Sequence, residues 1–332
     1  MNSTLFKKRI TEMVAWVGIL GLVVAAHGEV EYRVKEHLGR HWGNQLVHYA
    51  FSAPRGACTA ENIRLEGPRG LQPVQLSEVE LWPESNSVKS ARLSFIVHEL
   101  QPLSENVYTV TWQEEPAEEP EPAADLKVAR AENVVSLATS RFAVRFALGE
   151  ETFDTLRAPE DVQGPVVRMR LADGTWFGGS HLYGETTVKS RSAHLTAAGP
   201  VFARVEVSYT YADSSTLDVA FDLTAGDYAM KVKMDVAGDR PEEGWELVLD
   251  DIIEVEDAVL LSGRTGGHAR EVKVDLEETA PSLSPWSGSG WFPHAPETIR
   301  LRLGGERGEL HLVARETETW VEPKERPWWG NF

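Results

Sequence analysis

The chain has 332 residues, of which 42% are hydrophobic and 25% are charged, a balance typical of folded proteins and not of disordered chains. Its formal net charge of −18 disfavours binding to nucleic acid, because an acidic surface repels the phosphate backbone. The single cysteine, Cys58, excludes an intrachain disulfide and is expected to be buried as a small hydrophobic side chain.

The N-terminus carries the three parts of a secretory signal peptide. Residues 7–9 (KKR) form a basic start, and residues 13–26 (MVAWVGILGLVVAA) form an apolar run. That run is shorter than the ~20 residues that span a bilayer, and Ala26 and Gly28 place small residues where a signal peptidase reads them. We therefore expect cleavage of residues 1–28 and export to the periplasm, the medium or the cell surface, with no membrane contact afterwards.

Residues 29–113 are expected to form a small β-sandwich. Short runs of alternating apolar and polar residues occupy residues 45–51, 74–81, 92–97 and 107–112, and Pro/Gly turns separate them. Several short strands in about 85 residues are typical of a compact sandwich.

The composition changes abruptly after this segment. Residues 114–125 read EEPAEEPEPAAD, without any aliphatic side chain larger than alanine. Proline stiffens such a segment and like charges extend it, so residues 114–127 are interpreted as a linker. A chain of this length is expected to contain two domains, and the second is placed at residues 128–332.

The second domain is also predicted to consist of strands. Residues 201–211, 217–223 and 228–236 alternate strictly between apolar and polar side chains and are separated by turns, which predicts an antiparallel meander with one dry face. Further strands are predicted at residues 141–148, 166–171, 245–249, 272–276, 299–303 and 309–315. No apolar helical periodicity persists, so the fold class is predicted to be all-β and antiparallel.

No strong catalytic signature is present in the sequence. It has no phosphate-binding P-loop, no GxSxG elbow, no HExxH pair and no EF-hand loop. We therefore expect neither a cofactor nor a bound metal, and candidate functional residues come from two aromatic loops.

Residues 175–185 (TWFGGSHLYGE) are predicted to form the first loop and carry three candidate catalytic residues, His181, Tyr183 and Glu185. A histidine and a tyrosine held close together could act as base and acid when a proton is removed beside a uronate carboxylate, as β-elimination requires. Arg191 would then neutralise that carboxylate. The alternative is a long hairpin connection with an exposed polar tip.

Residues 282–294 (SLSPWSGSGWFPH) are predicted to form the second loop, with Trp286, Trp291 and His294 among Ser, Gly and Pro. Sugar rings stack their apolar face on indole, so these residues and Trp176 are candidates for substrate binding. The alternative is that the rings pack beneath the loop as a small satellite core.

Residues 198–236 (AGPVFARVEVSYTYADSSTLDVAFDLTAGDYAMKVKMDV) resemble the central meander of galactose-mutarotase-like β-supersandwich domains. The segment at 36–57 (EHLGRHWGNQLVHYAFSAPRGA) is similar to the N-terminal modules of large secreted bacterial proteins, among them exo-rhamnogalacturonan-lyase-like proteins. The resemblance implies a β-supersandwich-like second domain, incomplete at its C-terminus, and a role with carbohydrates. It supplies no catalytic residue that matches a position here.

Three functional hypotheses follow from these observations. The first is an exported, polysaccharide-lyase-like enzyme or another glycan-active enzyme such as a hydrolase, with a polysaccharide or oligosaccharide as its partner. The second is a glycan-binding accessory module without catalytic activity. The third is a scaffold of the cell envelope that binds another protein through an exposed sheet edge.

Overall fold

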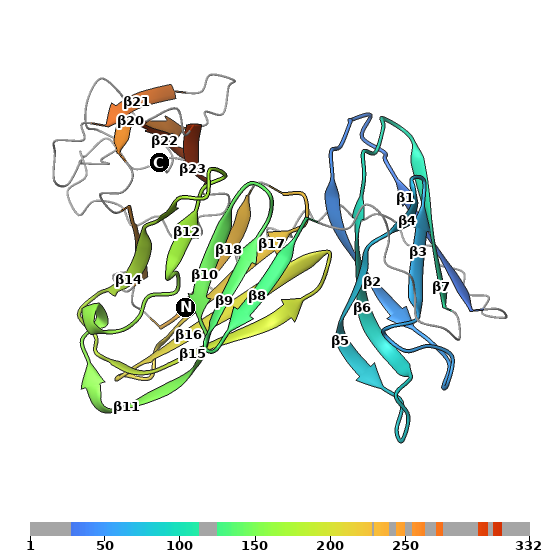
Figure 1. Cartoon of the computed structure of the whole chain (residues 1–332), viewed down its shortest axis with the longest axis horizontal. Coiled ribbons are helices and arrows are strands. Elements are labelled where there is room, and N and C mark those ends of the chain that lie inside the picture. The colour runs from blue at the N-terminus through green and yellow to red at the C-terminus, as the bar shows by residue number, and fades with distance from the viewer. Residues whose placement is uncertain are drawn as a thin grey trace, which may run out of the picture. The chain divides into compact units, whose positions relative to one another are not determined.

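The computed structural model describes residues 28–112, 125–227, 229–238, 244–249, 254–262, 270–274, 298–304 and 308–313. Within these ranges the regular structure is β-strand, apart from one short 3-10 turn at Pro159–Asp161, and none of it is a helix long and apolar enough to cross a membrane. The described strand pairs are antiparallel, which confirms the predicted fold class (Figure 1). Residues 1–27 of the predicted signal peptide and most of the predicted linker lie outside the described residues.

The chain forms two compact units, and each is described by itself. The first contains the described residues up to Leu126, together with Ala197–Ala203 and Thr224–Gly226, and the second contains the remainder. The first unit is built from two antiparallel sheets. One sheet has the order β1 (Glu29–Lys35), β7 (Glu105–Trp112), β3 (Ile63–Gly67), β4 (Gly70–Gln72). The other has the order β2 (Gln45–Ser52), β6 (Val88–Val97), β5 (Val74–Leu81).

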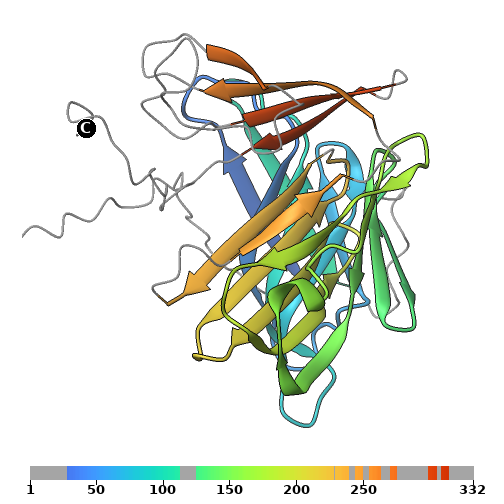
Figure 2. The same cartoon turned by 90° about the vertical axis from the view of Figure 1, so that its left-hand side faces the viewer.

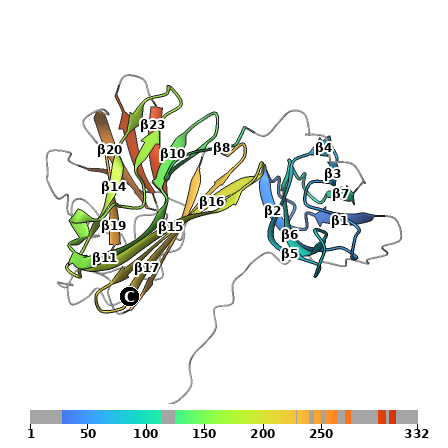
Figure 3. The ribbon, with the colours of Figure 1, turned by 60° about the horizontal axis from the view of Figure 1, so that its bottom comes forward.

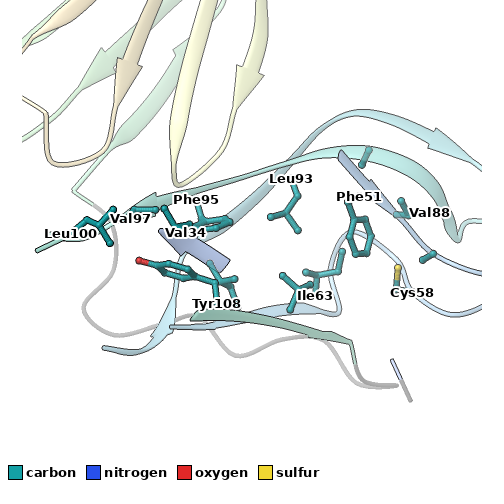
Figure 4. Packing of buried hydrophobic residues seen from close by; sticks show 14 residues of the cluster. Val34, Phe51, Cys58, Ile63, Val88, Leu93, Phe95, Val97, Leu100 and Tyr108 are labelled. Atoms are coloured by element: carbon teal, nitrogen blue, oxygen red, sulfur yellow. The ribbon is translucent and has the colours of Figure 1, made fainter. Parts of the chain in front are cut away.

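Aromatic rings join the two sheets of the first unit into one core (Figure 4). The ring of Phe95 on β6 lies 4.7 Å from that of Tyr108 on β7 and is stacked 5.7 Å from that of Tyr49 on β2. Cys58 is buried in the same cluster, and this burial raises the pKa of its thiol to about 11. The core position expected for Cys58 is confirmed.

A buried carboxylate organises the loop that follows β1. Glu36 is only 3% exposed, and its side chain accepts hydrogen bonds from the backbone N–H groups of Leu38 (2.7 Å), Gly39 (2.8 Å) and Leu103 (2.9 Å). The indole Nε1 of Trp42 donates a further bond of 3.2 Å. Burial opposes ionisation of this group, but the donors outweigh it and lower the pKa of Glu36 to about 2.

Replacing Glu36 by glutamine is expected to destabilise the first unit in a pH-dependent way. Because the pKa of Glu36 falls from its usual 4.5 to about 2 on folding, its contribution to stability is present above about pH 4.5 and is lost as the pH falls towards 2. The variant should therefore unfold at least ~5 °C below the parent at pH 7, and the difference should shrink at pH 3. Thermal unfolding at both pH values tests this, with the exposed Glu66→Gln as control. A difference that does not change with pH would contradict it.

The second unit contains two five-stranded sheets (Figure 1). The first has the order β13 (Trp176–Phe177), β12 (Arg168–Arg170), β10 (Ala143–Ala147), β9 (Val134–Ala138), β8 (Lys127–Ala131). The second has the order β11 (Gly149–Arg157), β15 (Val188–Ala198), β16 (Phe202–Tyr211), β17 (Thr216–Thr224), β18 (Met230–Ala237). The rings of Phe146 on β10 and Phe221 on β17 lie 4.9 Å apart, so the inner faces of the two sheets share a core.

The predicted meander is confirmed as β16, β17 and β18, with one difference. The inward side chains of β16 and β17 are buried, but Val232 and Met234 on β18 are 47% and 51% exposed, although both were predicted on the dry face. The physical reason is position, because β18 is the end strand of its sheet in the part of the chain that the structure describes, and there it has a neighbouring strand on one side only.

Two smaller groups of strands complete the second unit. The strands β14 (Gly179–Tyr183) and β19 (Gly244–Val248) pair with each other (Figure 3). Four C-terminal strands, coloured orange to red in Figure 2, form a separate sheet. Its order is β21 (Arg270–Val274), β20 (Val255–Ser262), β22 (Thr298–Leu303), β23 (Gly308–Val313). Leu303 of this sheet packs against Phe177 of β13.

Candidate functional site

The candidate site is built on β14, inside the segment that was predicted to be a loop. That prediction is wrong, because residues 176–177 and 179–183 form β13 and β14. Gly178 lies between them with a φ of +61°, a left-handed conformation that glycine adopts without strain. A Cβ atom at this position would also stand 2.5 Å from the carbonyl oxygen of Val248, so the chain turns here where only glycine fits.

A histidine and a glutamate face each other across the β14–β19 ribbon. His181 lies directly opposite Glu246, and its Nε2 atom is 2.5 Å from Glu246 Oε1. Both side chains are about half exposed. Leu182, which lies between His181 and Tyr183 on β14, is buried. The alternation of the strand therefore anchors β14 through Leu182 and presents the histidine on its open face.

Tyr183 follows on the same face of β14, two residues after His181, and is 46% exposed. It lies opposite Gly244, where a Cβ atom would come within 2.8 Å of the tyrosine hydroxyl oxygen. The missing side chain at Gly244 gives the tyrosine ring room to lie across β19. Glu185 is exposed and lies beyond the end of β14, so the strand itself does not position it.

The other edge of β14 is held closely by the segment that precedes β12. Gln163 forms an isolated bridge to His181, and the hydroxyl of Ser180 both accepts a bond from Val166 N (2.7 Å) and donates one to Val166 O (3.0 Å). At Gly164 a Cβ atom would lie 2.2 Å from the carbonyl oxygen of Ser180. These contacts fix the backbone of His181 on both sides, as a positioned catalytic group requires.

Trp176 was predicted to bind substrate, and it lies on β13 between two arginines. The guanidinium carbon of Arg145 is 3.8 Å from the centroid of the Trp176 ring, and that of Arg170 is 5.6 Å away. The indole is partly exposed. The structure thus surrounds this aromatic platform with positive charge.

Arg191, expected to neutralise a substrate carboxylate, is placed inside the second unit. It is only 6% exposed on β15, and its Nη2 atom donates a 2.7 Å bond to the carbonyl oxygen of Ala147. It lies near the buried Tyr209, whose hydroxyl donates to the carbonyl oxygen of Gln163. Burial raises the pKa of Tyr209 to about 12, although the nearby guanidinium lowers it in part. Arg191 is thus linked through Tyr209 to Gln163, the residue that forms the isolated bridge to His181.

Three predicted substrate-binding residues, Trp286, Trp291 and His294, lie outside the described residues. Conversely, the structure adds residues that the sequence did not single out, namely Glu246, Arg145 and Arg170. A prediction that residues 179–183 and 244–248 pair as neighbouring strands would have identified Glu246 as the partner of His181. A single sequence offers no signal for that pairing, because 65 positions separate Glu246 from His181.

Within the described ranges, no three His, Cys, Asp or Glu side chains come together in a way that could hold a metal ion. No protein-family model matches the chain, and a comparison with curated proteins finds no match. The function is therefore argued from the geometry of the residues.

Proposed function

We propose that this chain is an exported carbohydrate-active protein that processes a polysaccharide, with His181 as the general base of a lyase-like reaction. The observation that carries the proposal is the 2.5 Å contact between His181 Nε2 and Glu246 Oε1 on the open face of β14. A carboxylate that accepts a hydrogen bond from Nε2–H leaves the lone pair of Nδ1 available, and this is the neutral tautomer that a general base requires.

Tyr183 supplies the complementary acid in this proposal. It shares the open face of β14 with His181, and a phenol can donate a proton to a departing oxygen. In β-elimination the base removes the proton beside the uronate carboxylate, the bond to the leaving oxygen breaks, and a double bond forms in the sugar ring. The leaving oxygen then takes the tyrosine proton. Neither water nor a redox partner is consumed.

The second candidate is glycan binding without turnover. It is favoured by the stack of Arg145 on Trp176, because an indole with neighbouring donors can hold a sugar with no catalytic group nearby. In that case the pair of His181 and Glu246 would be an exposed cross-strand contact of small energetic value.

A glycan screen on the chain from Glu29 onward separates the two candidates. The protein is mixed with a panel of acidic and neutral polysaccharides while tryptophan fluorescence and the ultraviolet absorbance of unsaturated uronate products are followed together. We expect absorbance to rise with a polyuronide. Fluorescence quenching with neither new absorbance nor new reducing ends would leave glycan binding alone, and silence in all three readouts would contradict both candidates.

A further inference from the structure

The outer face of the sheet formed by β8, β9, β10, β12 and β13 has an unusual composition. Residues directly opposite each other in antiparallel strands share a face, so the register assigns Arg145, Arg168, Arg170, Trp176 and Lys127 to this outer face. The remaining positions on this face are small or apolar: Ala129, Ala131, Val134, Ser136, Ala138, Ala143 and Ala147. In a chain with a net charge of −18, this face has four cationic residues and no carboxylate at any of these paired positions.

The tryptophan orders the arginines of this face. Trp176 lies opposite Arg170 across β12 and β13, yet its ring reaches past β12 to Arg145 on β10, with a separation of 3.8 Å from the guanidinium carbon. This distance is that of a guanidinium in direct contact with the ring. A guanidinium stacked in this way engages its flat face and leaves the N–H donors around its edge able to bind an anion.

Arg145 and Arg170 keep donors that the described part of the protein does not use. In the part of the chain that the structure describes, Arg145 contacts the ring of Trp176 but forms no ion pair, and the buried Nε–H of Arg170 has no hydrogen-bond acceptor. A buried donor without a partner costs free energy, which a bound acceptor would recover.

We propose that the outer face around Arg145, Trp176 and Arg170 binds the carboxylate or sulfate group of an acidic saccharide. The planar guanidinium groups bind an oxyanion through paired N–H donors, and the indole holds the guanidinium of Arg145 in place. Electrostatic attraction concentrates the acidic polymer at a positive surface of an otherwise acidic protein. In this proposal the outer face binds the charged group and so holds the saccharide. The proton transfer is carried out by the residues of β14.

This inference takes the saccharide nature of its ligand from the proposed function, but it is tested separately from catalysis. Binding of the full chain from Glu29 is measured by titration calorimetry with polygalacturonate, with dextran sulfate and with neutral dextran. The variants are Arg145→Gln/Arg170→Gln and Arg145→Lys, which keeps the charge and loses the planar fork. The matched control is Arg130→Gln, because Arg130 is exposed on β8 and lies opposite Val135, on the other face of the same sheet.

We expect one or both acidic polymers to bind and neutral dextran not to bind, and the polymer that binds identifies the oxyanion as carboxylate or sulfate. The double variant should weaken binding by about tenfold or more, the lysine variant should also weaken it, and Arg130→Gln should change it by less than about twofold. Circular dichroism shows whether each variant is folded. If the double variant does not fold, the binding constant of the Arg145→Lys variant tests the inference instead.

Three results would overturn the inference. The first is absence of binding to both acidic polymers, and the second is binding of neutral dextran as tight as that of the acidic polymers. The third is a loss of affinity in Arg130→Gln as large as that in the double variant, which would show a general charge effect. The polysaccharide-processing function would survive each of them, because formation of an unsaturated product is measured in a separate assay and does not require this face. A variant that still binds the acidic polymer but forms no unsaturated product would have a defect in catalysis, which we assign to β14, and not in binding by this face.

Discussion

Replacing His181 by alanine is expected to lower the rate of polysaccharide breakdown by about 10²–10⁴-fold, the range by which a positioned general base accelerates a reaction. Substrate affinity should remain close to that of the parent, because we propose that the face around Arg145 and Arg170 holds the saccharide. In the proposed mechanism Glu246 on β19 accepts a hydrogen bond from the Nε2–H group of His181 on β14 and so orients the ring. Initial rates and binding constants, measured with the polysaccharide found in the screen, test this expectation.

The chain offers a matched control for this variant. His194 on β15 is also exposed and also faces a carboxylate, with 3.4 Å between its Nε2 atom and Glu150 Oε1. His194→Ala should therefore retain the parent rate. Glu246→Gln should reduce the rate less than His181→Ala, because the amide oxygen can still accept a hydrogen bond from Nε2–H but no longer carries charge. If His181→Ala breaks down the polysaccharide as fast as the parent, the lyase-like mechanism is excluded.

Replacing Phe95 by alanine is expected to destabilise the first unit by about 3–5 kcal/mol. Phe95 is completely buried, and its ring contacts those of Tyr49 on the same sheet and Tyr108 on the other. The loss combines the hydrophobic transfer free energy with the cavity left between the sheets, and it is comparable to the whole stability of a small domain, about 5–15 kcal/mol. Chemical denaturation followed by near-ultraviolet circular dichroism measures it.

Two further variants interpret the Phe95 result. Phe95→Leu refills most of the volume and should lower the free energy of unfolding by less than half as much as Phe95→Ala. Leu71→Ala removes a leucine that is 43% exposed in the same unit and should change the free energy of unfolding by at most about 0.5 kcal/mol. A Phe95→Ala protein as stable as Leu71→Ala would show that the two sheets of this unit do not depend on their aromatic contacts.

The sequence was most informative where one face of a strand is apolar and the other polar. The alternation over residues 201–211 and 217–223 predicted β16 and β17 together with their buried residues, because both strands line a core on one face. It missed β15 (VKSRSAHLTAA), whose inward positions include Arg191 and alanines and so show no apolar alternation. Such a strand is stabilised by its neighbours in the sheet, and its own side chains do not reveal it.

The candidate site was predicted only in part, for a similar reason. The segment with Trp176, His181 and Tyr183 was recognised by its residue types, and the glycines within it were read as a loop. Gly178 instead separates two short strands where the backbone approaches Val248. The partner of His181 comes from β19, and it is tertiary pairing that brings the two residues together.

The end position of β18 has a consequence for how this protein behaves at high concentration. An end strand with exposed apolar side chains can recruit an identical strand from another molecule and begin aggregation. Here Val232 and Met234 alternate with Lys231, Lys233 and Asp235, so charged side chains interrupt the apolar run, and Lys233 and Asp235 form an ion pair with each other. We expect these charged side chains to act as gatekeepers that weaken self-association through this strand.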